Sequence, residues 1–336
     1  PVAKPGRDSA GHCRRPGLHH ANWRGMTMSP IRSRERFFDL LTTSAVSTWV
    51  SSTTPVRELA RGYIAGDNLG VAMEVAADQV SKGLNFSVRF LADRATDRHQ
   101  AAACTAEALA AINAIRARPE LTGTAELSLA LTGLGLDVDP VLAHDNAVTV
   151  IGAAQEAGIL VTIDDEGPGD HDAIMQVQRR LLKEYPDTGV VVQAARHDSL
   201  DQLDELITAG RRIRLCKGSY TGPPSVTLIR PHDIDLRMAS CLRTLLTSPA
   251  RPLIATHDPV FVAITERMMS SLGRTDVEFQ MLHGIRPLEQ RRLVDVGRRM
   301  RVYLPYGTNW YEYGIRRLVE RPANLWLLSR SVVRHR

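Results

Sequence analysis

Two adjacent arginines near the carboxyl end of the chain are the residues most clearly suited to bind a ligand. In the segment YEYGIRRLVE, Tyr313, the pair Arg316 and Arg317, and Glu320 follow one another in steps of three and four residues, so on a helix they share one face. Paired guanidinium groups offer forked donors that match a carboxylate, and Tyr313 can pack a small ring beside them. A solvated helix with Arg–Glu ion pairs gives the same pattern. The segment alone therefore leaves a carboxylate site and an exposed surface both open.

Polar side chains also gather at the ends of six consecutive apolar runs. They are Asp164, Asp165, Glu166, Gln193, Lys217, Gly218, Ser219, Tyr220, Thr256, His257, Asp258, Gln280, His283 and Tyr303. A strand end that meets water explains any one of them equally well, but six runs in succession favour a shared site. A metal-dependent hydrolase needs several ligands that converge on one ion, and only His257 and His283 are well placed for that. We therefore expect no metal site.

The apolar runs have the length of β-strands and alternate with amphipathic helical segments. The expected strands are 85–92, 125–133, 158–166, 189–195, 211–218, 251–258, 277–284 and 299–307. The expected helices between and after them are 98–117, 138–157, 170–185, 198–209, 232–247, 259–272, 286–297 and 309–321. Eight such units favour a closed barrel of parallel strands, with its active site at the carboxyl ends of the strands.

The pattern along the chain predicts three parts. Residues 1–30 are rich in Arg, Pro, Gly and His and lack periodicity, which predicts a disordered lead-in or an extension. Residues 31–84 are expected to hold N-terminal helices at 34–48 and 56–82. Residues 85–331 form the barrel as one domain, a size that a single α/β barrel can reach.

Composition narrows the class of protein. No apolar run approaches the roughly 20 residues of a membrane helix. The four cysteines are far apart and form no pair at metal-ligand spacing, so neither a disulfide framework nor a zinc site is expected and a reducing cytoplasm fits best. The net charge of +5 comes from basic residues that are spread over helix faces and both ends, without interleaved aromatic residues. We therefore expect no nucleic-acid partner.

Four segments together resemble the proline dehydrogenase family, in its usual order and approximate spacing. They are RLCKGSY at 214–220, ATHD at 255–258, FQMLHG at 279–284 and VYLPYGTNWYEYGIRRLVERPAN at 302–324. The stretches IDDE at 163–166 and VVQA at 191–194 agree with them. The resemblance implies a distorted (β/α)8 barrel that binds FAD and oxidises L-proline to 1-pyrroline-5-carboxylate. Hydride transfer to the flavin N5 and later reduction of a quinone are implied with it.

The same resemblance assigns roles to individual residues. Those implied at the substrate are Asp164, Tyr220, Leu282, Tyr303, Tyr313, Arg316 and Arg317, with the two arginines on the substrate carboxylate. Those implied at the cofactor are Gln193, Arg214, Cys216, Lys217, Gly218, Thr256, His257, Asp258, Gln280 and Glu320. The expected location is the cytoplasm, with peripheral contact at the inner face of the membrane left open.

Two positions depart from the family pattern. The second strand of these enzymes usually carries a lysine, in a pattern like S-x-K-x-S, and here Ala130 stands in its place. Arg89 stands in the first strand where the family more often has an acidic residue. Losing a charge-assisted hydrogen bond to the substrate costs about 1.5–3 kcal/mol. Three hypotheses follow: Arg89 supplies the missing charge, the substrate is a modified cyclic imino acid of a specialised pathway, or the protein is a flavin-binding paralogue without catalysis.

Overall fold

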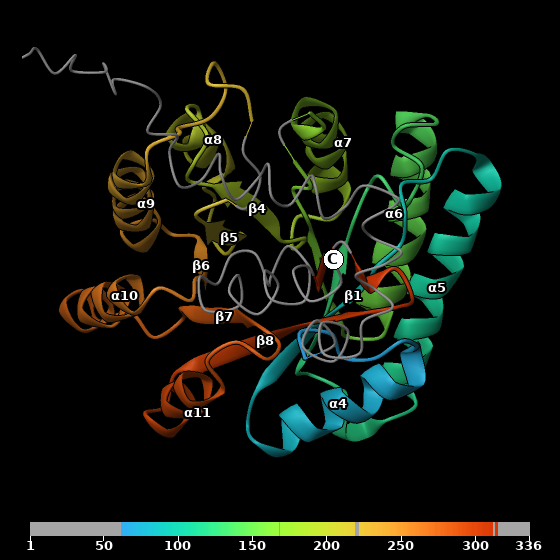
Figure 1. The fold of residues 1–336 in the computed structure, drawn as a ribbon, viewed down its shortest axis with the longest axis horizontal. Helices are drawn as coiled ribbons and strands as arrows, with labels where there is room; N and C mark the ends of the chain where they lie inside the picture. Colours follow the sequence, from blue (N-terminus) through green and yellow to red (C-terminus); the bar gives the residue numbers. More distant parts are fainter. Residues whose placement is uncertain (1–61, 168, 219–221, 312, 315–336) are drawn as a thin grey trace, which may run out of the picture.

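The computed structural model describes residues 62–167, 169–218, 222–311 and 313–314. In this part of the chain, eight parallel strands form one sheet in the order β3-β2-β1-β8-β7-β6-β5-β4. The sheet closes because its two end strands also meet: the Ile163 N–H donates to the Gly189 carbonyl at 2.9 Å, and the Gly189 N–H donates to the Val161 carbonyl at 2.8 Å. Helices surround the resulting barrel (Figure 1). The predicted (β/α)8 barrel is confirmed.

Each strand lies inside a run that the sequence predicts as a strand. The strands are β1 (Asn85–Phe90), β2 (Ala125–Leu129), β3 (Leu160–Ile163), β4 (Val190–Gln193), β5 (Arg212–Cys216), β6 (Arg251–Ala255), β7 (Glu278–Leu282) and β8 (Arg299–Tyr306). All of them end before the predicted carboxyl end, so the last residues of each run lie beyond the strand. These residues form the rim of the barrel at the carboxyl ends of the strands, which we call the mouth.

The helices follow the strands as expected for βα units. They are α4 (Leu69–Ser81), α5 (Arg98–Arg116), α6 (Pro140–Glu156), α7 (His171–Glu184), α8 (Ser199–Leu206), α9 (Pro231–Leu246), α10 (Pro259–Leu272) and α11 (Pro287–Asp295), with a short 3-10 helix at Pro119–Leu121. Several begin with a proline, whose missing N–H costs nothing in the first turn. Aspartates cap others: the Asp97 side chain accepts from the Gln100 N–H, and the Asp139 side chain accepts from the Val141 N–H.

One predicted helix begins later than expected. The segment 56–82 was predicted to be helical, but within its described part α4 begins only at Leu69, after the N-cap Asn68. Gly66 lies against this first turn, where a Cβ would stand 2.6 Å from the Val71 side chain, and its backbone bridges to Tyr306 of β8. Pairing with the barrel therefore overrides helix formation here. The predictions for 1–30, for 34–48 and for most of 309–321 lie outside the described residues.

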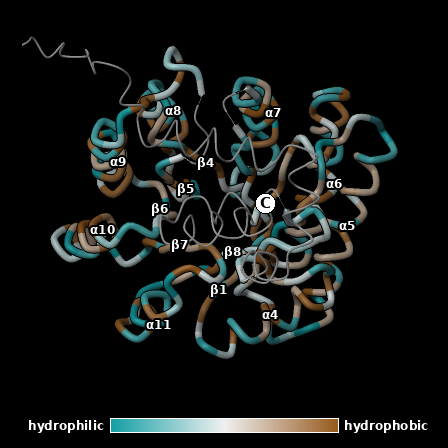
Figure 2. The backbone as a smooth tube through the Cα atoms, in the orientation of Figure 1, coloured by the Kyte–Doolittle hydropathy of each residue, from teal (hydrophilic) through white to brown (hydrophobic). Residues whose placement is uncertain are grey.

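The core has two parts because successive strand residues point to opposite sides. Leu127 and Ile213 are buried members of the apolar layer between strands and helices, and Figure 2 shows hydrophobic and hydrophilic residues alternating around the helices. Glu126 and Arg212 point the other way and meet inside the barrel. No helix among the described residues is long and apolar enough to cross a membrane. The cytoplasmic location remains a prediction.

Candidate active site

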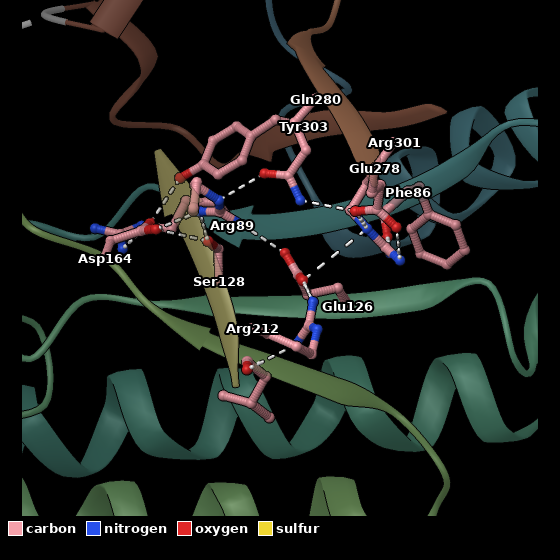
Figure 3. A network of polar contacts seen from close by, with 12 residues as sticks. Phe86, Arg89, Glu126, Ser128, Asp164, Arg212, Glu278, Gln280, Arg301 and Tyr303 are labelled. Carbon is pink, nitrogen blue, oxygen red and sulfur yellow. Dashed lines mark hydrogen bonds and ion pairs between the residues drawn. The ribbon is translucent and has the colours of Figure 1, made fainter. Parts of the chain in front are cut away.

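A layer of buried ion pairs fills the barrel below the mouth (Figure 3). Glu126 of β2 is fully buried and accepts hydrogen bonds from both Arg212 and Arg214 of β5. Glu278 of β7 accepts from Arg301 of β8 at 2.7 and 3.0 Å. Burial alone would raise the pKa of Glu126, but the neighbouring arginines hold it well below the usual range. Paired charges thus replace the aliphatic packing that is usual inside such barrels.

Asp164, directly after β3, is the centre of the contacts above this layer. Among the described residues, four side chains donate to its carboxylate. Ser128 at 2.8 Å and Arg214 at 2.7 Å donate to Oδ1, while Tyr303 at 2.8 Å and Arg89 at 3.1 Å donate to Oδ2. Four donors fill the acceptor capacity of a carboxylate. The orientation of Asp164 is therefore fixed from four strands, β1, β2, β5 and β8.

Tyr303 provides a fixed hydroxyl and a ring at the mouth. Burial and the Asp164 carboxylate raise the pKa of Tyr303 well above that of an ordinary phenol, and the nearby Tyr313 acts in the same direction. Leu282 is paired in register with Tyr303 on the neighbouring strand, and the Arg214 guanidinium lies 5.6 Å from the Tyr303 ring centre. Four residues predicted at the substrate, Asp164, Leu282, Tyr303 and Tyr313, are thus near one another in the described part of the chain.

Arg89 joins Asp164 to a second carboxylate. Its Nη2 donates to Glu166 at 3.0 Å, and the other oxygen of Glu166 accepts from the Thr132 N–H at 3.1 Å. The Arg89 side chain is only 12% exposed. Burial opposes its charge, but Tyr303, Glu166 and Asp164 together raise the pKa of Arg89, so it stays a cation. Arg89 therefore lies in the mouth, and its guanidinium is shared between two carboxylates.

Arg214 connects the buried layer with residues predicted at the cofactor. Its Nε donates to Gln280 Oε1 at 2.7 Å, and Gln280 Nε2 donates to Glu278 at 2.8 Å. Gln193 lies at the end of β4, buried, and its amide donates to the Asp165 carbonyl at 3.4 Å. These contacts hold Arg214, Gln193 and Gln280 with little freedom.

The residues after β5 show why glycine is needed at position 218. Gly218 has a φ of 101°, and a Cβ there would stand 2.9 Å from Gln193 Oε1, so only glycine fits without strain. Cys216, two residues earlier, is half-buried, and desolvation together with Asp165 raises the pKa of its thiol to about 12. Cys216 is therefore a thiol rather than a reactive thiolate at neutral pH.

Lys217 and Asp258 form a separate polar group where β5 and β6 end. The ammonium lies 2.8 Å from Asp258 and 2.6 Å from Asp235, and 4.7 Å from the Phe261 ring centre. Burial opposes the charge, but the two aspartates raise the pKa of Lys217. Asp258 also caps α10 through the Val260 N–H. These residues are held by each other and by the helix end.

His257 is fixed by backbone contacts. Its Nε2 accepts from the Leu282 N–H at 2.9 Å, and its carbonyl accepts from Arg286 at 2.8 Å. Because Nε2 accepts a hydrogen bond, the proton of the neutral ring is on Nδ1. Beside it, Thr256 Oγ1 accepts from the Asp258 N–H at 3.1 Å. In the described part of the chain, no group of three or more His, Cys, Asp and Glu side chains is arranged to hold a metal ion.

Four of the predicted site residues lie outside the described part of the chain: Tyr220, Arg316, Arg317 and Glu320. Sequence reasoning missed Glu126, Ser128, Arg212, Glu278 and Arg301, all of which point into the barrel. The available signal was their two-residue spacing within strands, as in RIR and in ELS, which places both polar side chains on one face.

The chain is similar in sequence to several known proteins. A family model described as proline dehydrogenase matches residues 72–330. Proline dehydrogenase 1 of Bacillus subtilis (strain 168) is 32% identical over 277 residues, which are 82% of this chain and 91% of that protein. Proline dehydrogenase of Deinococcus radiodurans is 29% identical over 273 residues, covering 79% of this chain and 87% of that protein.

Solved structures show a similar fold. Proline utilization A from Bdellovibrio bacteriovorus, inactivated by N-propargylglycine, superposes with a TM-score of 0.74 at 20% identity. The match covers 87% of this chain but only 37% of that longer chain. A mutant of proline utilization A from Bradyrhizobium japonicum gives a TM-score of 0.64 at 20% identity, over 78% of this chain and 31% of that one.

Proposed function

The chain belongs to the proline dehydrogenase family of oxidoreductases, and we propose that it oxidises L-proline to 1-pyrroline-5-carboxylate with FAD as its cofactor. The observation that carries this proposal is the fixed group of Asp164, Tyr303 and Arg214 at the carboxyl ends of three strands. An active site of a (β/α)8 barrel is expected at this end.

The residues of the mouth suit a flavin. Gly218 leaves free the space that a Cβ would fill beside Gln193, and a backbone without a side chain allows close approach of a planar ring. Arg214, Gln193 and Lys217 offer N–H donors to ring and phosphate oxygens. We therefore assign the FAD contacts to ten residues: Gln193, Arg214, Cys216, Lys217, Gly218, Thr256, His257, Asp258, Gln280 and Glu320. When bound, FAD supplies the hydride acceptor, and a quinone takes the electrons afterwards.

Tyr303 acts as a wall and a hydrogen-bond donor rather than as a base. Its phenol stays protonated at neutral pH, because its pKa is raised well above the ordinary value, and its proton is directed at Asp164. It therefore does not take the proton of the proline nitrogen. Its ring and the Leu282 side chain shield the reacting carbon from water, and orientation of this kind is the main contribution of a protein to cofactor chemistry.

Arg316 and Arg317 are proposed to bind the substrate carboxylate, with Tyr220 and Tyr313 beside the ring. A modified cyclic imino acid is the second candidate substrate. It is favoured by Ala130, which stands where the family usually has a lysine. A paralogue without catalysis is disfavoured, because the contacts of Asp164 are complete within the described residues.

Anaerobic reduction of the bound flavin tests the proposal. Proline and a panel of cyclic amino acids are added to purified protein, and the loss of yellow absorbance is followed in a stopped-flow instrument. We expect proline to bleach the flavin, Asp164→Asn to slow this strongly, and Asp137→Asn, which changes an exposed partner of Arg94, to leave it unchanged. Protein that takes up no FAD, or that no cyclic amino acid reduces, would refute the proposal.

A further inference from the structure

Arg89 reaches across one strand of the barrel. In the sheet, β2 lies between β1 and β3. Arg89 belongs to β1, yet its guanidinium contacts Asp164 and Glu166, which follow β3. The side chain therefore passes over the carboxyl end of β2.

Ala130 lies at the point that Arg89 crosses. Ser128 is in register with Thr162, and the Asp164 N–H donates to the Leu129 carbonyl at 2.8 Å, so the next step in this register places Ala130 beside Asp164. Ser128 points into the barrel, and alternation then turns the Ala130 side chain to the same side. A longer side chain at position 130 would enter the space of the Arg89 guanidinium.

The charges at this point balance only with Arg89 present. Asp164 and Glu166 are two half-buried carboxylates, and Arg89 contacts both. Arg214 also contacts Asp164, but it is shared with Glu126 below. Among the described contacts, Arg89 is the cation that pairs with Glu166, and its loss would leave this carboxylate unpaired close to Asp164. A substrate that carries a carboxylate would then meet excess negative charge, which repels it strongly in a partly buried site.

We propose that Arg89 determines specificity for a carboxylate-bearing substrate, because it neutralises Asp164 and Glu166 from β1 while the short side chain of Ala130 leaves room for it. The inference rests on the proposed function. Arg89 is then a positioning residue that acts through Asp164 and Glu166. A long side chain at position 130 fits only when the Arg89 side chain is absent.

Steady-state kinetics on four variants test this. Arg89→Met should raise KM for proline about tenfold to hundredfold, the equivalent of one charge-assisted hydrogen bond, with a smaller change in kcat. Arg89→Met combined with Glu166→Gln removes one charge of each sign and should recover most of this loss. Arg89→Met combined with Ala130→Lys supplies the cation from β2 and should recover KM to within about tenfold of the wild-type value. Ala130→Lys alone should crowd two cations, lower Tm and bring no decrease in KM.

Arg94→Met is the matched control. Arg94 also bridges two carboxylates, Asp137 and Asp170, but these residues lie beyond the ends of the strand runs and the Arg94 side chain is 50% exposed. Its loss should leave KM unchanged. An unchanged KM in Arg89→Met, no recovery in either double variant, or a lower KM in Ala130→Lys alone would overturn the inference.

The wild-type protein separates this inference from the proposed function. If it does not reduce its flavin with proline, the proposed function fails. The inference is then decided by the rise in Tm that proline causes: Arg89→Met should lose this rise, and Arg94→Met should keep it. Equal rises in both variants, or none in the wild type, would overturn the inference.

Discussion

Neutralising Glu126 should destabilise the protein far more than neutralising an exposed glutamate. Glu126 is fully buried and accepts from Arg212 and Arg214. In Glu126→Gln these arginines lose their shared counter-charge. Removing one partner of a buried ion pair costs about 3–5 kcal/mol. We expect about 3 kcal/mol, because glutamine keeps one acceptor oxygen and Arg301 keeps Glu278.

The pH dependence gives a second, independent signature. The folded-state pKa of Glu126 lies well below the ordinary glutamate value of 4.5, so its stabilising contribution is complete above that value and is lost as the pH falls below it. The difference in unfolding free energy between wild type and Glu126→Gln should therefore be largest at neutral pH. It should narrow as the pH falls below 4.5.

Urea unfolding followed by circular dichroism, at pH 7 and in acid, measures both effects. Glu205→Gln is the control, because Glu205 also pairs with an arginine, Arg179, at 2.5 Å, but is 45% exposed. An exposed pair contributes about 0–1 kcal/mol. If Glu126→Gln loses no more than this control, the buried layer is not the stabilising feature that its contacts indicate.

Four other variants test the proposed site. Tyr303→Phe removes a hydrogen bond to Asp164 and should lower kcat/KM for proline by about tenfold; unchanged kinetics would assign the hydroxyl no role. Arg316→Met or Arg317→Met should weaken substrate binding by several kcal/mol, if the carboxylate is left buried and unpaired, while flavin absorbance after denaturation stays at the wild-type level. Parallel loss of FAD would identify a cofactor contact instead. Gly218→Ala forces an alanine to a φ of 101° and should weaken FAD binding by about 1–3 kcal/mol, measured by titrating the apoprotein with FAD. An unchanged affinity for FAD would contradict the proposed contact between FAD and Gly218.

The strands were predictable because each is a short apolar run with its own pattern. Their ends were not, since Asp164 and Thr256 continue the run in sequence but lie just beyond the ends of β3 and β6. The start of α4 was missed for a related reason. Residues before Leu69 have helical composition, yet Gly66 pairs with Tyr306 of β8, a contact more than 200 residues away in the chain that no local window contains.

The buried ion pairs were missed, although Arg214 itself was predicted at the cofactor, because the sequence gives the spacing of the charged residues but not their partners. The two-residue spacing of Arg212 and Arg214 places both side chains on one face of a strand, and by itself this pattern is also typical of a face exposed to solvent. Only closure of the barrel brings Glu126 of β2 opposite them. Asp164, Tyr303 and Gln280, by contrast, came from segments that resemble one family, and the structure brings all three into contact with Arg214 or its partners.

Arg214 explains how the fold fixes the proposed site. One guanidinium contacts Glu126 in the buried layer, Gln280 beside it, and Asp164 at the mouth. Any movement of Asp164 would therefore disturb a buried ion pair, which costs several kcal/mol. The rigidity that orientation of a substrate requires comes from this layer rather than from the loops of the mouth. Arg89 adds its own contact to the same carboxylate from the opposite side. The cation at the mouth can therefore change while Arg214 still holds Asp164, and the departures at positions 89 and 130 are compatible with the proposed proline site.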